Sequence, residues 1–515
     1  MRVLLIAPPR RIWPYINEQD NYLLPQWMAC LGAVVREAGL EVRLIDCMPE
    51  HIGWRSLAER IRDWRPDVIA SGENHALFAC EVCRLSELAK TIDPAIVTVV
   101  GGAHFTVLHE HYLTRHPIDV IVRGEGELTF RELLRAVAGG GLQAARDVAG
   151  IAYRDGGEVI TNPPRELVAE LDDLPLPAYD LLPMERYGRA KYLFSPGGAT
   201  IHHSRGCIGG CHFCAWWRQM ARREVNRADE GCRSERLVPH WRTKSVERTL
   251  EEMELLHRRW GKRCLVFVDP TFNVDPDWSD AFAEALLQKR GWDLNWFAFL
   301  RADLMLRDER LGILEKLVRS GLVHVCIGVE RVDDDELKAW NKPQASREIY
   351  EETFAVLREK YPQVFRQATF IVGTRDETPE SLETQFRFSQ QIGADYPAFH
   401  PITPFPGTDL FEEARERGWI EITDFERYDL MTAVMSSTQM SREDIDRALA
   451  ELNRRAVGPR WLLKGLLSRS EYRRNMYIWW LLVTGRLFLD SVRQRLNPFS
   501  AERYTGSIEP DWYNE

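Results

Sequence analysis

Short apolar runs rich in β-branched residues alternate with helical patterns over the first 140 residues. The runs lie at 3–6, 41–45, 68–70, 96–100 and 119–122. Between the first two, Trp27, Leu31, Val34, Val35 and Ala38 recur at helical spacing, and Gly39 follows as a C-terminal cap. Strands separated by helices in this rhythm predict a doubly wound parallel sheet with helices on both faces.

The loops that follow these strands are candidates for ligand binding, because open parallel sheets bind ligands beyond the carboxyl ends of their strands. Glycine in such loops lets the backbone approach a bulky ligand, although tight turns also need glycine. The candidate residues are Ser71, Glu73, Gly101, Gly102, His104, Gly124, Glu125 and Gly126.

The alternation stops at 141–195, where a predicted hairpin (151–153 and 159–161) leads into a proline-rich linker. It resumes with apolar runs at 200–204, 264–268, 295–299, 323–328, 367–372 and 397–401. Thr378 and Pro379 mark the start of one intervening helix. Six such units predict a partial (β/α)6 barrel, in which the chemistry lies at the carboxyl ends of the strands. The predicted domains are 1–140, 141–195, 196–415 and a helical region, 416–515.

Composition narrows the function class. The 515 residues carry 67 Lys and Arg against 77 Asp and Glu, a net charge of −10, which argues against general nucleic-acid binding. No apolar run reaches the roughly 20 residues that span a bilayer, and the N-terminus lacks a signal-peptide cleavage site. Ten cysteines in a chain of this length favour metal or catalytic use over a disulfide scaffold. We therefore expect a cytoplasmic multidomain enzyme.

Three cysteines follow the first barrel strand closely. Cys207, Cys211 and Cys214 enclose Gly209 and Gly210, which favour a loop that can wrap around a metal centre. Iron–sulfur clusters are usually held by four Cys thiolates, so three would leave one iron open. The alternative is a zinc site with His212 or His203 as the fourth ligand.

The Cys-x3-Cys-x2-Cys spacing after the first strand of a six-unit barrel resembles the radical S-adenosylmethionine enzymes. The segments that close the later strands are also similar: 267–273, 299–303, 328–330, 370–373 and 404–408. The first 140 residues resemble the flavodoxin-like cobalamin-binding domain of one branch of that family, through the loops at 101–104 and 123–127. The likeness covers roughly 1–415.

This resemblance implies a [4Fe–4S] cluster on the three cysteines, with S-adenosylmethionine and cobalamin as further cofactors. Reductive cleavage of S-adenosylmethionine would give a 5′-deoxyadenosyl radical, and a donor such as flavodoxin or ferredoxin would supply low-potential electrons. The loops of the first domain would hold cobalamin. Residues at the barrel strand ends would hold S-adenosylmethionine, unless they only cap the barrel: Asp269, Asn273, Arg301 and Glu330.

Two features depart from the family pattern. The cobalamin-ligating Asp-x-His-x-x-Gly signature is absent at 46–51, so we assign no protein ligand to cobalt. Arg331 follows Glu330 where Ser is usual; it could contact a carboxylate of cofactor or substrate, or form a surface salt bridge. Cys232 and Cys326 could quench a radical or donate a proton, or simply be buried. Cys80 and Cys83 could form a redox or metal pair, but their helical pattern favours core packing.

The C-terminal region is basic and aromatic, with ten Lys or Arg against two acids from Arg454 to Arg495. It could lie on an anionic membrane, cradle an acidic or lipid-like substrate, or form a helical lid. Its aromatic residues are Trp461, Tyr472, Tyr477, Trp479 and Trp480.

The leading hypothesis is methylation of an unactivated carbon of a small-molecule or lipid-like substrate. The enzymatic alternative is an oxidative cyclase, similar to the anaerobic magnesium-protoporphyrin monomethyl ester cyclase. A cobalamin or redox sensor is the alternative from another class. A methylthiotransferase is disfavoured, because no second Cys triplet is visible.

Overall fold

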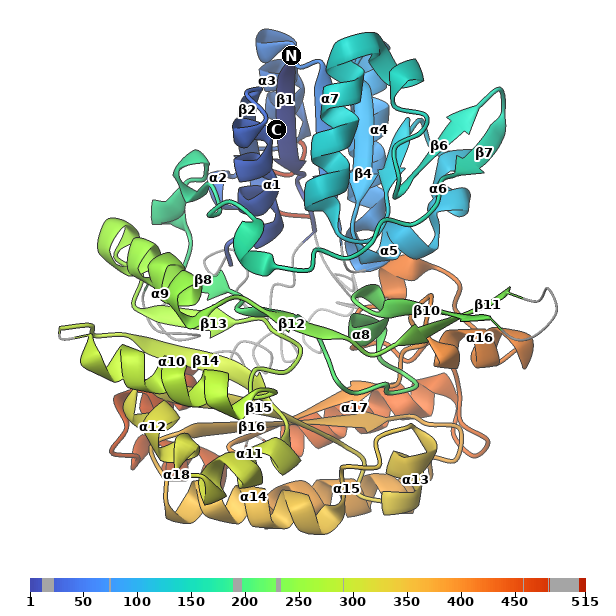
Figure 1. The fold of residues 1–515 in the computed structure, drawn as a ribbon. Helices are drawn as coiled ribbons and strands as arrows, with labels where there is room; N and C mark the ends of the chain where they lie inside the picture. Colours follow the sequence, from blue (N-terminus) through green and yellow to red (C-terminus); the bar gives the residue numbers. More distant parts are fainter. Residues whose placement is uncertain are drawn as a thin grey trace. The chain divides into compact units, whose positions relative to one another are not determined.

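The computed structural model describes residues 1–11, 23–73, 76–188, 197–227, 233–289, 291–456, 458–479, 481 and 509–515. They form two compact units (Figure 1). The first contains the described residues up to Tyr187 together with 509–515, and the second contains those from Gly188 to 481.

A seven-stranded sheet forms the centre of the first unit, in the order β2-β1-β3-β4-β5-β6-β7. The four pairings among β1 to β5 are parallel, whereas β5–β6 and β6–β7 are antiparallel. The predicted hairpin is therefore the edge of this sheet. The strands are β1 Arg2–Ala7, β2 Glu41–Asp46, β3 Val68–Gly72, β4 Val97–Gly101, β5 Val120–Val122, β6 Ile151–Asp155 and β7 Glu158–Thr161.

Helices cover both faces of this sheet, as predicted. Val3, Leu4, Leu5 and Ile6 are all at most 1% exposed, so both faces of β1 are packed. On one face Leu57, Ile61 and Leu85 join Leu4 and Ile6 in a single core cluster. The helices are α1 Gln26–Glu37, α2 Cys47–Glu50, α3 Trp54–Trp64, α4 Ala79–Ile92, α5 Ala103–Val107, α6 His109–Arg115 and α7 Gly126–Ala144.

Residues 509–515 return to the first unit. The backbone N–H of Trp54 donates to Tyr513 O at 3.0 Å, and the Trp512 ring stacks on His51 with centroids 5.2 Å apart. A Cβ at Gly53 would lie 2.1 Å from Trp512 O, so glycine is needed there for this close approach.

The second unit is built on six parallel strands in the order β17-β16-β15-β14-β13-β8, which confirms the partial barrel. These are β8 Gly198–Ile201, β13 Cys264–Phe267, β14 Asn295–Leu300, β15 Leu322–Glu330, β16 Phe365–Val372 and β17 Tyr396–Pro401. The helices are α8 Ala215–Gln219, α9 Val246–Glu254, α10 Pro276–Gln288, α11 Ala302–Arg310, α12 Ile313–Arg319, α13 Asp334–Ala339, α14 Arg347–Glu359, α15 Pro379–Gln391, α16 Asp409–Glu416, α17 Arg442–Ala456 and α18 Pro459–Leu466.

One predicted strand is wrong in detail. The run 200–204 does not continue straight, because β8 ends at Ile201 and the chain turns into β9 (Ser204–Gly206). Strand β9 pairs antiparallel with β12 (Trp241–Thr243), and a separate hairpin joins β10 (Arg222–Arg227) to β11 (Arg233–Val238). The helix after Thr378 is confirmed as α15, with Thr378 and Ser381 forming a capping box.

The C-terminal segment 459–479 packs at the amino ends of the barrel strands. Tyr472, Met476 and Tyr477 form one core cluster with Cys264 and Phe365, the first residues of β13 and β16. The predicted aromatic residues Trp461, Tyr472, Tyr477 and Trp479 are at most half exposed, and Trp480 lies outside the described residues. This part of the chain closes the end of the barrel that is remote from the cysteine loop.

A buried ionic cluster fastens this segment. The Asp395 carboxylate, directly before β17, accepts hydrogen bonds from Arg366 (2.8 Å), Arg473 (2.5 Å) and the Tyr477 hydroxyl (2.8 Å). Burial raises the pKa of Asp395, but Arg366 and Arg473 outweigh it and hold the pKa below its ordinary value. The carboxylate is thus charged and compensated.

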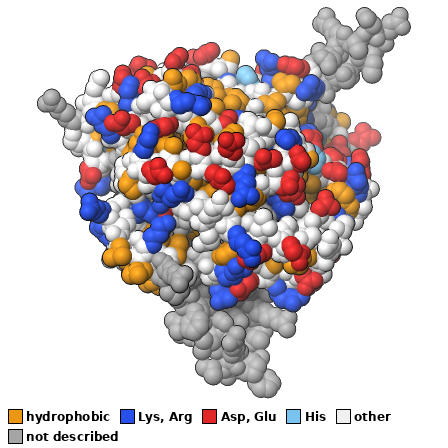
Figure 2. Space-filling model, turned by 90° about the horizontal axis from the view of Figure 1, so that it is seen from below, with side chains coloured by type: hydrophobic (Ala, Val, Ile, Leu, Met, Phe, Trp, Pro, Cys, Tyr) orange, Lys and Arg blue, Asp and Glu red, His pale blue; other side chains and the backbone are white. Residues whose placement is uncertain are grey.

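Figure 2 shows the molecule from below. On this face the acidic and basic side chains of the described residues are interspersed, and neither sign of charge dominates. Within the described ranges, none of the helices combines the length and the apolar character that crossing a membrane requires.

Replacing Asp395 by Ala is expected to lower the free energy of unfolding by about 3–5 kcal/mol, because two buried guanidinium groups lose their counter-charge. Urea unfolding followed by tryptophan fluorescence measures the change. Lys464→Ala is the control, since Lys464 is 52% exposed and 4.0 Å from the same carboxylate, and it should cost under about 1 kcal/mol. Equal losses in both variants would contradict this assignment.

Candidate functional site

The three predicted cysteines lie on the loop between β9 and α8. All three are partly exposed. A Cβ at Gly209 would lie 3.7 Å from Cys207 Sγ and 3.8 Å from Cys211 Sγ, and the Gly209 N–H donates to Cys207 Sγ at 3.3 Å. Gly209 therefore lies against the sulfur atoms of Cys207 and Cys211, where a side chain would crowd them.

The thiols influence one another electrostatically. Burial, together with the neighbouring Cys211 and Cys207, raises the pKa of Cys214 to about 12, although backbone N–H groups of Trp217 and Trp216 oppose the rise. Burial also raises the pKa of Cys211. Thiolates need a compensating positive centre here, which an iron cluster would supply. The donor set thus fits the group that the sequence predicts.

Both histidines of the zinc alternative have neighbours other than the thiols. His203 is fully buried and stacks on Trp278 at 4.0 Å, with Nδ1 3.1 Å from Thr243 Oγ1. His212 Nε2 lies 3.5 Å from a Glu413 carboxylate oxygen. In the described part of the chain, no three His, Cys, Asp or Glu side chains, the three cysteines included, lie close enough together to hold a single metal ion.

Asp269, predicted to bind a cofactor, is fully buried at the end of β13. Its carboxylate accepts hydrogen bonds from the backbone N–H of His203 (3.1 Å) and from the N–H and hydroxyl of Ser204 (2.5 and 2.6 Å). Burial raises its pKa to about 7, and the Ser204 hydrogen bonds oppose the rise. This carboxylate turns the chain out of β8 and thereby positions the loop that starts at Cys207.

Asn273 and Arg301 are also engaged within the barrel. Asn273 Oδ1 accepts from the Arg301 N–H at 3.1 Å, and its Nδ2 donates to Asp308 at 3.0 Å. The Arg301 guanidinium forms a bidentate pair with Asp303 at 3.0 and 2.7 Å, close enough to Cys211 to lower its pKa. Asn273 therefore fixes the end of β14, and Arg301 places a cation near the thiols.

Glu330 ends β15 in a strained conformation. Its φ of +67° is left-handed, and the register with β16 shifts between Gly328 and Glu330. A Cβ at Gly328 would lie 2.3 Å from Glu330 Oε1, so glycine makes room for the carboxylate. A left-handed non-glycine residue costs about 1–2 kcal/mol, and such strain gathers at functional sites.

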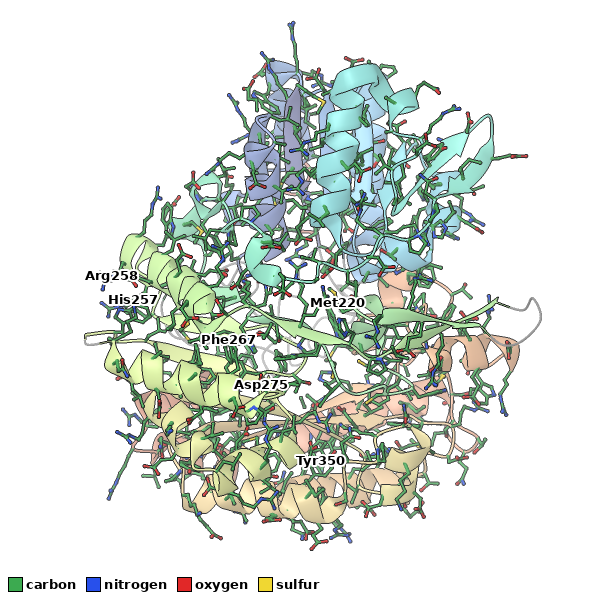
Figure 3. All side chains as sticks on the ribbon, viewed as in Figure 1. Met220, His257, Arg258, Phe267, Asp275 and Tyr350 are labelled. Carbon is green, nitrogen blue, oxygen red and sulfur yellow. The ribbon has the colours of Figure 1, made fainter. Side chains whose placement is uncertain are left out.

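Lys342 is a site residue that the sequence reasoning missed. Its Nζ donates to Gly328 O at 2.7 Å and lies 3.3 Å from Glu330 Oε1. Tyr350 of α14 (labelled in Figure 3) donates its hydroxyl hydrogen to the same Gly328 carbonyl at 3.2 Å. No motif marks Lys342, because it reaches the strand end only through the turn after α13.

Arg331 forms a salt bridge, but a buried one, so the expectation of a surface pair is wrong. The residue is 3% exposed, and its guanidinium contacts Glu336 at 2.6 Å and Glu377 at 2.7 Å. Both carboxylates arrive from elements that pack against the end of β15. Cys326 is also buried, in a cluster with Val266 and Phe297.

The other cysteines singled out in the sequence differ in burial. Cys83 is buried in α4, consistent with packing, whereas Cys80 is exposed. Cys232 lies outside the described residues.

In the first unit, a pocket lies at the carboxyl ends of β1, β2 and β3, where ligands of such sheets bind. Of the predicted residues it contains Glu73. Residues that the sequence reasoning did not select also line it, among them Arg10, Asp46, Met48 and Phe78.

Gly101 and Gly102, at the end of β4, let the loop that carries Glu73 come close to their backbone. The Glu73 N–H donates to Gly101 O at 3.1 Å, and Gly102 has φ +100°, with a position for Cβ only 2.3 Å from Glu73 O. Gly102 therefore shapes the loop that carries Glu73.

The other predicted residues of this unit make internal contacts. Ser71 Oγ donates to Ile6 O at 2.8 Å, and His104 Nε2 lies 2.7 Å from the Tyr112 hydroxyl. Burial lowers the pKa of His104 to about 4. Glu125 accepts from the Val168 N–H at 2.7 Å, while Gly124 and Gly126 form the turn into α7.

Asp46 is one of two buried acids that line the pocket, the other being Glu81. The Asp46 carboxylate accepts from the Tyr187 hydroxyl at 2.9 Å and from the Met48 N–H at 3.4 Å. Burial raises its pKa to about 6, opposed by Tyr187 and Arg10.

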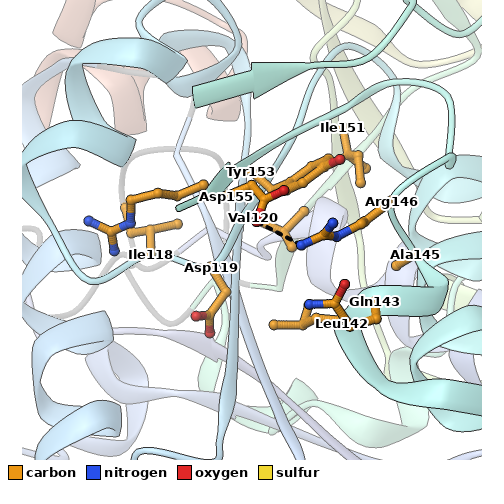
Figure 4. A pocket seen from close by; sticks show the side chains of 11 residues that line it. Ile118, Asp119, Val120, Leu142, Gln143, Ala145, Arg146, Ile151, Tyr153 and Asp155 are labelled. Carbon is orange, nitrogen blue, oxygen red and sulfur yellow. Dashed lines mark hydrogen bonds and ion pairs between the residues drawn. The ribbon is translucent and has the colours of Figure 1, made fainter. Parts of the chain in front are cut away.

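A second pocket of the unit lies beside Ile118 and Asp119, before β5 begins, and carries the Arg146–Asp155 ion pair of 2.7 Å (Figure 4). It is at the amino end of the strand, so the first pocket is the candidate ligand site.

Two protein-family models match this chain, one in each of its two compact units. The B12 binding domain model matches residues 12–134, and the Radical SAM superfamily model matches residues 201–388. An uncharacterized methyltransferase, PH0819, of Pyrococcus horikoshii is 30% identical over 87% of this chain and 91% of its own length. The chain belongs to the cobalamin-binding radical S-adenosylmethionine enzymes. Its cofactors are accordingly a [4Fe–4S] cluster, S-adenosylmethionine and cobalamin.

A second relative and a solved structure also match most of this chain. The anaerobic magnesium-protoporphyrin IX monomethyl ester cyclase of Rubrivivax gelatinosus is 29% identical, over 88% of this chain and 77% of that protein. The solved structure of the methyltransferase TsrM from Kitasatospora setae, with cobalamin and a [4Fe–4S] cluster, has a TM-score of 0.69 at 14% identity. It covers 95% of this chain and 99% of that one, and it supports the fold.

Gly102→Ala is expected to destabilise the first unit by more than about 2 kcal/mol and to reduce corrinoid retention, because the new methyl group collides with Glu73 O. Gly124→Ala is the matched control. Gly124 also has a positive φ, +76°, but nothing lies within 4 Å of its Cβ position, so about 1 kcal/mol is expected. Urea unfolding and bound corrinoid per chain are measured; equal corrinoid loss in both variants would contradict a specific role for Gly102.

The raised pKa of Asp46 predicts a pH dependence. The folded protein binds the Asp46 proton more tightly than the unfolded chain does. The protonated carboxyl group therefore adds its full share to the free energy of unfolding below about pH 4, and this share is lost as pH rises through about 6. The expected loss is about 2–3 kcal/mol. Asp46→Asn should remove this part of the dependence, measured as the difference in Tm between the variants from pH 4 to 8. Parallel Tm curves would show that Asp46 does not titrate in this range.

Proposed function

We propose that this protein is a cobalamin-dependent radical S-adenosylmethionine methyltransferase that methylates an unactivated carbon of a small-molecule or lipid-like substrate. The observation that carries the proposal is the cysteine loop beside the strained Glu330 at the carboxyl ends of the barrel strands. Cys207, Cys211 and Cys214 are the proposed cluster ligands. When bound, the cluster supplies the electron for cleavage of S-adenosylmethionine, and cobalamin supplies the methyl group.

The residues around the thiols then have distinct proposed roles. Glu330 accepts hydrogen bonds from the ammonium or hydroxyl groups of S-adenosylmethionine, and Arg301 favours its carboxylate. Asp269 and Asn273 are fully buried and internally bonded, which supports positioning roles for them. In the first unit, Glu73 and Asp46 offer acceptors to the amide groups of cobalamin, while Ser71, Gly101, Gly102, His104, Gly124, Glu125 and Gly126 shape the loops.

Methylation is favoured over cyclisation because the relative from Pyrococcus horikoshii, which is named a methyltransferase, spans nearly the whole chain. The cyclase relative supports oxidative cyclisation as the second candidate. We further propose a cytoplasmic location and a low-potential donor such as flavodoxin or ferredoxin. A peripheral membrane contact would involve the exposed Leu463 and Leu467 of the C-terminal region.

The cluster assignment predicts that replacing Cys207, Cys211 or Cys214 by Ala abolishes both the brown chromophore and 5′-deoxyadenosine formation in anaerobically reconstituted protein. Cys326→Ala is the control, because Cys326 is buried in the same barrel against Val266 and Phe297. It should keep about four irons per chain. A full cluster in all three loop variants would refute the assignment.

The two candidate reactions differ in their products. Methyl transfer yields a methylated product and S-adenosylhomocysteine in addition to 5′-deoxyadenosine, whereas cyclisation yields no methylated product. S-adenosylmethionine with a deuterated methyl group therefore distinguishes them by mass spectrometry, once a substrate library has been incubated with the reduced enzyme.

A further inference from the structure

Three consecutive residues after α13 contact both the cysteine loop and the end of β15. Trp340 O accepts from the His212 N–H at 3.0 Å, and the Trp340 ring meets Phe213 edge-on at 5.1 Å. Asn341 Nδ2 donates to Gly210 O at 2.7 Å. We call residues 340–342 the clamp, because it joins two segments that are far apart in sequence.

The buried salt bridges of Arg331 hold the helix α13 that precedes the clamp. Glu336 lies on α13, and its carboxylate receives two hydrogen bonds from Arg331, at 2.6 and 3.1 Å. Asn341 has φ +55° directly after α13, which turns the chain towards the site. The position of Lys342 therefore follows from α13, which Arg331 holds, and from the turn at Asn341.

Lys342 brings a positive charge to this junction. Its side chain is 12% exposed, and Nζ lies 2.7 Å from Gly328 O and 3.3 Å from Glu330 Oε1. Burial lowers its pKa, but Tyr350, Glu330 and Cys211 outweigh this and raise it, so the amine is protonated. Lys342 directly follows Asn341, which donates to the carbonyl of Gly210, the residue before Cys211, so the clamp holds the ammonium group beside the cysteine loop.

We propose that Lys342 is a positioning residue of the cluster site, whose ammonium group orients the Glu330 carboxylate and raises the reduction potential of the cluster held at Cys211. The inference rests on the proposed function, since it requires the cluster on the three cysteines. Three thiolates and Glu330 are all negative, and adding an electron to the cluster increases that charge. A fixed cation in a site of low dielectric constant stabilises the reduced form.

The test is an EPR-monitored potentiometric titration of the reconstituted full-length protein, without substrate. One electron passes from dithionite to the oxidised [4Fe–4S]2+ cluster, which becomes [4Fe–4S]+; no bond is made or broken. Lys342→Met should shift the midpoint potential to a more negative value, whereas Lys342→Arg should restore the potential of the unmodified protein.

Lys338→Met is the matched control. Lys338 lies on α13 and loses the same charge, but it is 62% exposed and pairs with Asp335 at 3.0 Å. It should leave the potential unchanged. Glu330→Gln supplies the opposite sign, because removing the carboxylate should shift the potential to a less negative value.

Each outcome decides the inference. An unchanged potential in Lys342→Met at full iron content, or an equal shift in Lys338→Met, would overturn it. If Lys342→Met fails to bind iron, Glu330→Gln decides, since the absence of a shift in the opposite direction overturns the electrostatic role. Failure of the unmodified protein to bind about four irons would instead refute the proposed function.

Discussion

The hydrogen bonds that the buried Asp269 carboxylate accepts from His203 and Ser204 are the constraint on which the barrel site depends. They lie where β8 ends at Ile201, three residues before the end of the predicted run at 204, and they direct the chain into β9. The cysteine loop leaves β9 directly, so its position follows from one carboxylate at the end of the neighbouring strand. Without this turn, Cys207 would continue along the sheet rather than lie beside the strand ends.

Charge around the loop is arranged in pairs. Arg301 pairs with Asp303, Arg331 with Glu336 and Glu377, and Lys342 with Glu330. Arg301, Lys342 and Glu330 affect the pKa of Cys211, whereas Arg331 acts at a distance by holding α13. Buried charges are tolerated because each has a counter-charge, and this same requirement fixes the geometry of the groups near the thiols.

The two ends of the barrel carry different tasks. At the amino ends of the strands, Asp395 binds Arg366, Arg473 and Tyr477, and aromatic residues of the C-terminal segment fill the opening. At the carboxyl ends, Glu330 adopts a left-handed conformation that costs free energy. Packing at one end can offset strain at the other, since both belong to the same six strands.

The sequence by itself determined the order of the sheet strands of both units, the cysteine loop and the glycine-rich loops, because apolar periodicity and ligand spacing are local properties of the chain; it did not predict β9 to β12. It also identified Asp269, Asn273, Arg301 and Glu330 as strand-end residues. Only the tertiary structure decided what these side chains contact. Lys342, Asp46 and the buried pairs of Arg331 depend on residues that are distant in sequence, and the place of the hairpin in the first sheet depends on strand pairing. Such contacts arise from packing between elements, which no local pattern records.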